Sequence, residues 1–271
     1  MDYLENYQAE LSGFHLALRV TLEVSDNQHG IRTDGRGVRA VRIFTRQTMT
    51  GLSLNKLLPS EFSEKGGNGS LYDLPSVASL VRNLIEGYLS LCFFGLESID
   101  DDEAELRFFI LQLHRNKEWY EIRKLLNPDD PELKDFKNGI RQEKLRIRNH
   151  PGFQKLSEDH RRYVMNGREI YTTKSEFEKK LPECNGLRRD YRLLSNLIHP
   201  LPLSIERINN EQGRGDFNMA DLRYMYMMTV IAKRYLAAST VGVCKLFLDT
   251  LGKTFENEIH TIEPMMFEDV M

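Results

Sequence analysis

The feature that most constrains the fold is a run of apolar residues at helical spacing between residues 77 and 93. They continue around nearly the whole circumference of the expected helix, which is typical of a helix buried on all sides. Asp73 or Ser76 is placed to cap its first turn. We therefore expect a central helix with the others packed around it. Its apolar residues are Val77, Leu80, Val81, Leu84, Ile85, Tyr88, Leu89, Cys92 and Phe93.

Helical spacing also dominates the rest of the chain, and only residues 170–173 resemble a strand. The pattern predicts an all-α fold, a single helical bundle of six or seven main helices that includes a long C-terminal helix. The main helices are expected at about residues 3–24, 38–58, 73–93, 100–126, 131–150, 188–199 and 218–251.

The sequence suggests three regions. Residues 1–72 form an N-terminal helical pair and a flexible linker, residues 73–254 form the bundle core, and residues 255–271 form an acidic tail that we expect to be loose. The linker contains the glycine-rich stretch 66–70, which lacks the Gly-Lys-Ser/Thr ending of a phosphate-binding loop.

The composition argues against several classes of protein. With a net charge of −3, the chain has no global basic field, so any surface for nucleic acid must be local. The cysteines Cys92, Cys184 and Cys244 lack metal-motif spacing and suit a reducing compartment. The N-terminus lacks the shape of a signal peptide, and the most apolar runs are too short to cross a bilayer. We expect a cytoplasmic protein that has no membrane association and needs no metal or cofactor.

The candidate chemistry lies on one face of the helix at 188–199. Arg192, Ser195, Asn196 and His199 occupy positions i, i+3, i+4 and i+7 and therefore share a face. Pro200 biases the preceding residue away from helical geometry, so His199 should stand at the helix end. An imidazole two turns from a guanidinium can act on a phosphate ester. Because Arg107 and His114 have the same spacing, the spacing alone does not identify the site.

This stretch carries a resemblance to known proteins. Tyr191, Arg192, Ser195, His199 and Pro200, preceded by the Arg-x-x-x-Glu segment at residues 82–86, resemble a bacterial family of uncharacterised all-helical proteins. More distantly, residues 73–250 resemble the HEPN superfamily. HEPN proteins are helical bundles, and many are metal-independent ribonucleases with an Arg-x(4–6)-His motif. The resemblance implies a HEPN-like core, an endoribonuclease that acts as a toxin or phage-defence effector, and a homodimer whose two motifs face each other.

The resemblance also implies roles for single residues. Arg192 matches the arginine of the nuclease motif and His199 matches its histidine. These nucleases usually carry a polar residue directly after the arginine; Leu193 stands there in this chain, and Asn196 could take that role one turn later. In such a mechanism RNA supplies its own 2′-hydroxyl as nucleophile, an imidazole exchanges the proton, and a guanidinium holds the phosphate.

Two other interpretations stay open. Arg82, Glu86, Ser195 and His199 could form one buried hydrogen-bonded network that fixes helix register in a non-catalytic protein with a protein partner. Alternatively, Arg82, Glu86 and His199 could form the polar floor of a small-molecule sensor. Exposure distinguishes these interpretations: a catalytic Arg192 and His199 should line an open basic cleft, whereas a structural pair should be sealed in the core with Glu86.

A local excess of basic residues precedes the motif. Residues 134–192 contain 16 Lys and Arg against 9 Asp and Glu. Such an excess suits an RNA backbone, although a solvated helical face has the same composition. The RNA-binding candidates are Arg146, Arg148, Arg161, Arg162, Arg188 and Arg189.

Overall fold

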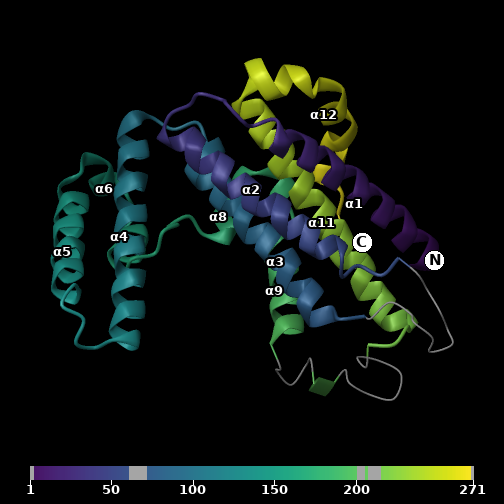
Figure 1. Ribbon diagram of the computed structural model, residues 1–271, viewed down its shortest axis with the longest axis horizontal. Coiled ribbons are helices and arrows are strands. Elements are labelled where there is room, and N and C mark those ends of the chain that lie inside the picture. Colours follow the sequence, from purple (N-terminus) through teal and green to yellow (C-terminus); the bar gives the residue numbers. More distant parts are fainter. Residues whose placement is uncertain (1–2, 61–71, 200–204, 207–214, 270–271) are drawn as a thin grey trace. The chain divides into compact units, whose positions relative to one another are not determined.

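The computed structural model describes residues 3–60, 72–199, 205–206 and 215–269 (Figure 1). All regular secondary structure in these ranges is helical, so the all-α prediction is confirmed. The described α-helices of twelve residues or more are α1 (Tyr3–Asp26), α2 (Gly35–Asn55), α3 (Leu74–Leu91), α4 (Asp101–Leu126), α5 (Leu133–Asn149), α9 (Leu187–Ile198) and α11 (Met219–Leu246). These seven agree with the predicted six or seven main helices. The glycine-rich stretch 66–70 and Pro200 lie outside the described residues.

Shorter helices connect the long ones. They are α6 (Pro151–Lys155), α7 (Glu158–Met165), α8 (Lys174–Lys180) and α12 (Glu256–Ile262), together with the single turns η1 (Cys92–Leu96), η2 (Pro182–Cys184), η3 (Leu248–Gly252) and η4 (Glu263–Phe267).

The chain divides into two compact units, which differ from the three expected regions. The first unit contains residues 1–96 and 174–271, and the second contains residues 97–173. The expected N-terminal pair belongs to the first unit because α1 packs along α11. Their contact includes a hydrogen bond of 2.8 Å between the hydroxyl oxygens of Thr21 and Thr240, which are both buried. The expected bundle core is therefore interrupted by a separate helical unit.

In the first unit, α3 lies against α2, α9 and α11, as expected for a central helix. The side chain of Asp73 accepts a hydrogen bond from the backbone N–H of Ser76, which caps the first turn. Within the described chain, the segment Leu74–Leu96 is the one helix long and apolar enough to cross a membrane. Most of that segment is buried by its helical neighbours, so its composition is that of a core helix.

The segment after residue 254 is not loose, so that expectation is wrong. It forms α12 and η4, and both pack on α11. Phe255, Ile262 and Met266 recur at helical spacing among the acidic residues and are buried. Their apolar contacts hold the C-terminal segment against the bundle.

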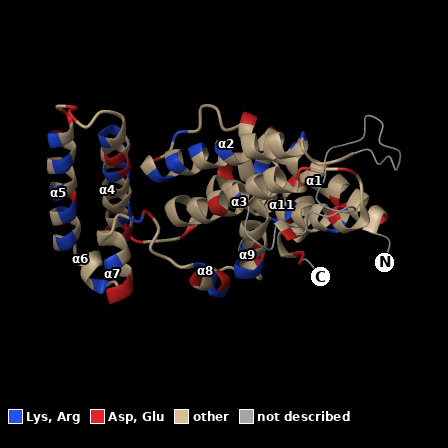
Figure 2. Cartoon of the chain, turned by 90° about the horizontal axis from the view of Figure 1, so that it is seen from below, with Lys and Arg blue, Asp and Glu red and all other residues tan. Residues whose placement is uncertain are grey.

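In the second unit, α4 and α5 pack against each other after a turn at residues 127–132 (Figure 1). Asp100 caps α4 by accepting a hydrogen bond of 2.8 Å from the backbone N–H of Glu103. The buried guanidinium of Arg107 forms ion pairs of 2.7 Å with both Glu97 and Glu103. These pairs tie the start of α4 to the residues before it. Basic residues recur along α5 (Figure 2).

Candidate functional site

The helix α9 carries the predicted motif and has two distinct sides. Leu187, Asp190, Leu194 and Leu197 are buried and follow one another at helical spacing. A helical register of 3.6 residues per turn places Arg192 and His199 on the opposite side, and both are exposed. The polar stripe predicted from the sequence therefore lies on the solvent side of α9.

His199 stands at the end of α9, as predicted from the proline that follows it. Its φ of −89° and ψ of 140° are extended, and its backbone N–H donates to the carbonyl oxygen of Ser195. The imidazole thus follows the last helical turn.

The two polar residues between Arg192 and His199 bond to their own helix. The hydroxyl of Ser195 donates to the carbonyl oxygen of Tyr191 at 2.7 Å, and the side-chain amide of Asn196 donates to the carbonyl oxygen of Arg192 at 2.8 Å. The guanidinium of Arg192 has no ion-pair partner within the described part of the chain. A negatively charged ligand can therefore approach it without displacing a carboxylate.

Arg82 and Glu86 form a polar cluster with Tyr191. The Arg82 Nε donates to Glu86 Oε1 at 3.0 Å, and the Tyr191 hydroxyl donates to the same oxygen at 2.7 Å. The Arg82 guanidinium also donates to the Tyr191 hydroxyl. Its carbon lies 4.4 Å from the centre of the Tyr191 ring, and the Lys174 Nζ lies 3.8 Å from that centre.

This cluster differs from the buried network expected of Arg82, Glu86, Ser195 and His199. The Arg82 and Glu86 side chains are 25% and 46% exposed, so the cluster lies at the surface. Tyr191 connects α3 to α9, whereas the Ser195 hydroxyl is used within α9. Burial raises the pKa of the Tyr191 phenol, and its hydrogen bond to the Glu86 carboxylate raises it further. The phenol therefore stays protonated as a donor to Glu86.

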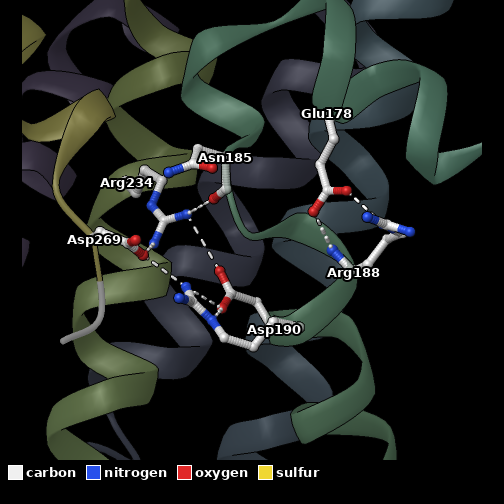
Figure 3. Close-up of polar contacts among 7 residues, drawn as sticks. Glu178, Asn185, Arg188, Asp190, Arg234 and Asp269 are labelled. Carbon is white, nitrogen blue, oxygen red and sulfur yellow. Dashed lines mark hydrogen bonds and ion pairs between the residues drawn. The ribbon is translucent and has the colours of Figure 1, made fainter.

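A buried ion-pair network holds α9 against α11 (Figure 3). Asp190 and Arg234 are both 1% exposed, and the Arg234 Nη1 lies 3.2 Å from Asp190 Oδ2 and 2.9 Å from the carbonyl oxygen of Asn185. The Arg189 Nε donates to the other Asp190 oxygen at 2.9 Å. Arg189 also donates to Asp269 at 2.6 Å, which links the C-terminal segment to the same network.

Burial and the neighbouring arginines shift the pKa of Asp190 in opposite directions. Burial raises the pKa of the carboxyl, and the guanidinium groups of Arg234 and Arg189 lower it without cancelling the rise. The position of Arg234 in an apolar stretch of α11 signals that a buried partner is needed, but sequence reasoning did not identify Asp190 as that partner. The network positions the helix that carries Arg192 and His199.

Four of the six RNA-binding candidates are held by carboxylates. Arg188 bonds to Glu178 through its backbone N–H, at 3.0 Å, and through its guanidinium (Figure 3). Arg189 bonds to Asp190 and Asp269, as described above. In the second unit, Arg162 pairs with an acidic residue one turn earlier, at 2.8 Å.

The other three candidates also belong to the second unit. Arg146 is the fourth arginine held by a carboxylate, because it pairs with Glu143 at 3.4 Å. Arg148 is exposed and Arg161 is half-buried. The six arginines therefore do not form one continuous surface: Arg188 and Arg189 belong to the first unit, and the other four belong to the second.

The second Arg–His pair of the same spacing has a structural role. The Arg107 guanidinium is buried in its pairs with Glu97 and Glu103. His114 Nδ1 lies 2.9 Å from the carbonyl oxygen of Gly167, to which it can hydrogen-bond. Arg107 is therefore buried and held by carboxylates, whereas the guanidinium of Arg192 is exposed.

Comparisons of this chain with protein-family models, with curated proteins and with solved structures found no match. The candidate site is therefore defined by its own side chains.

Proposed function

We propose that this protein is a metal-independent endoribonuclease of the HEPN-like kind, with Arg192 and His199 as its catalytic pair and Asn196 as a supporting polar residue. The observation that carries the proposal is the exposure of Arg192 and His199 on the solvent side of α9. A buried pair sealed with Glu86 would have favoured a purely structural role. Seven positions separate the two residues, which is about 10 Å along the helix axis.

The proposed reaction uses the nucleophile of the substrate itself. The 2′-hydroxyl oxygen of RNA bonds to the adjacent phosphorus while the bond from phosphorus to the 5′-oxygen breaks. His199 accepts the proton of the 2′-hydroxyl, and the leaving 5′-oxygen takes a proton from solvent or from the imidazole of a second subunit. The products are a 2′,3′-cyclic phosphate and a 5′-hydroxyl end.

Arg192 provides electrostatic stabilisation in the proposed mechanism. Its guanidinium can donate two parallel hydrogen bonds to phosphate oxygens and stabilises the charge that develops on them in the transition state. Its lack of a carboxylate partner in the described chain supports this role. The resemblance to HEPN proteins extends the proposal to a cytoplasmic homodimer that acts on RNA as a toxin or in phage defence.

The alternative is a non-catalytic helical interaction protein. The ion pairs of Arg188 and Arg189 with Glu178, Asp190 and Asp269 favour it, because they neutralise the basic residues nearest to the motif. In that case the Arg82–Glu86–Tyr191 cluster and the Asp190–Arg234 network serve only to hold α9 in place.

Cleavage in the presence of EDTA tests the proposed function. Purified protein is incubated with total RNA and with tRNA, beside the His199→Ala variant and a His260→Ala control, which removes an exposed histidine of α12. We expect the wild type and the control to produce cyclic phosphate ends and His199→Ala to produce none, with unchanged circular dichroism. Equal cleavage by a folded His199→Ala variant would refute the assignment.

A further inference from the structure

Five cationic side chains lie along one face of α5. Lys134, Lys137, Arg141, Lys144 and Arg148 follow at intervals of three and four residues, the spacing that aligns side chains on a helix. Fourteen positions separate the first from the last, so this basic stripe is about 21 Å long. Figure 2 shows basic residues recurring along α5.

The basic stripe is not neutralised by the described residues. None of its five side chains has an ion-pair partner in the described part of the chain, and all except the half-buried Lys144 are exposed. The acidic residues of α5 are Asp135 and Glu143, which fall outside the stripe, and Glu143 pairs with Arg146. The stripe therefore differs from most of the other arginines predicted to bind RNA, which are held by carboxylates.

The cations also act on one another. Burial lowers the pKa of Lys144, and the charges of Lys117 on α4 and Arg148 lower it further. This mutual repulsion indicates a concentration of positive charge that a polyanion would relieve.

The shape of the stripe selects among anionic partners. A small anion would need cations that converge on one point, whereas a row of charges along a helix matches a polymer with regularly spaced charges. A membrane surface would also need an apolar helix face to insert into the bilayer. The apolar residues of α5 do not provide one: Ile147 is buried, Leu133, Phe136 and Ile140 are half-buried, and the helix packs against α4. Leu145 is the one exposed apolar side chain of this helix, and a single leucine does not make an apolar face.

We propose that the basic stripe of α5 binds the sugar–phosphate backbone of a nucleic acid. This inference deepens the proposed ribonuclease function, on which it rests, because it names the surface that holds the substrate RNA. DNA has the same backbone charge, so it is included as a separate arm of the test.

The test measures binding separately from cleavage. A labelled 30-nucleotide RNA and the DNA of the same sequence are titrated with full-length His199→Ala protein, and fluorescence anisotropy is read between 50 and 300 mM salt. If all five side chains contact phosphates, log K should fall with log salt with a slope of about −3.5. Replacement of Lys134, Lys137 and Arg141 by Gln should reduce that slope by about two and weaken binding about tenfold or more.

A charge-matched control is available in the first unit. Arg19, Lys245 and Lys253 are exposed and already paired with Glu23, Glu263 and Asp249, and their replacement by Gln removes the same three charges. We expect this control to bind RNA within twofold of the parent. Circular dichroism melting establishes that both triple variants fold.

Several results would overturn the inference. Unchanged RNA binding in the stripe variant would do so, as would equal weakening in both triple variants. Stripe-dependent binding to phosphatidylserine vesicles without binding to nucleic acid would assign the surface to a membrane.

The same experiments distinguish failure of the stripe proposal from failure of the proposed nuclease. Stripe-dependent binding of RNA with no cleavage by the wild type would refute the nuclease while supporting the stripe. Wild-type cleavage with stripe-independent binding would refute the stripe alone.

Discussion

Asp190 and Arg234 form an ion pair in which both side chains are 1% exposed, and it joins α9 to α11 across 44 positions of sequence. Replacement of Asp190 by Ala would remove both acceptor oxygens and leave the buried Arg234 guanidinium without its hydrogen-bond partner on α9. We expect Asp190→Ala to lower the free energy of unfolding by about 3 kcal/mol, measured by urea denaturation. The control Asp249→Ala, which removes the 91% exposed partner of Lys253, should leave stability unchanged. Equal stability of both variants would contradict this account of the network.

The pair between Glu178 and Arg188 gives a pH dependence of stability. Burial by itself raises the pKa of the Glu178 carboxyl, but hydrogen bonds from the Arg188 backbone N–H and guanidinium outweigh it, so that the pKa falls below its ordinary value of 4.5. A carboxyl whose pKa is lower in the folded protein contributes stability above the unfolded pKa and loses it as pH falls through the folded pKa.

Glu178→Gln tests this sign. The wild type should be more stable than the variant above about pH 4.5, and the difference should shrink below that pH, as measured by urea denaturation between pH 6 and pH 3. A difference that grows as pH falls would show that the folded pKa is raised instead.

The hydroxyl of Tyr191 couples α3 to α9 through Glu86 and Arg82. We expect Tyr191→Phe to cost about 0.5–1 kcal/mol, a modest value because the cluster is partly exposed. In a double-mutant cycle with Glu86→Ala, which removes the oxygen that accepts from the Tyr191 hydroxyl, the two losses should not add, because each variant removes the same hydrogen bond. Additive losses would mean that the hydroxyl and the carboxylate do not interact in solution.

If Arg192 holds phosphate through its planar fork of donors, a lysine should not replace it. We expect Arg192→Lys to keep the stability of the wild type and to slow RNA cleavage about tenfold to a hundredfold. Arg42→Lys, at an exposed position of α2, is the matched control and should cleave normally. The same rate in both variants would remove Arg192 from the mechanism.

Local patterns predicted the local structure well. The apolar spacing of residues 77–93 identified a central helix, and Pro200 placed His199 at a helix end. The C-terminal helices were missed because acidic residues concealed the spacing of Phe255, Ile262 and Met266. Contacts between distant residues are harder to predict, since Arg234 could have paired with any of 40 acidic residues.

In the candidate site, too, the local features could be predicted from the sequence, whereas the contacts between distant residues could not. Its residues Arg192 and His199 could be named from spacing and resemblance, and their exposure follows from the alternation of buried and polar positions on α9. The role of Tyr191 and the separation of residues 97–173 into their own unit depend on tertiary contacts. The chain enters and leaves that unit without a proline- or glycine-rich linker, so no composition change marks the boundary.

The contacts of α11 have a consequence for synthesis on the ribosome. Lys233 pairs with Glu10 near the start of the chain and with Glu268 near its end. Residues 97–173 can pack as soon as they emerge, because their partners lie within the same stretch. The helix with Arg192 and His199 is held by Arg234 and Asp269, so its packing can be completed only after residue 269 has been translated.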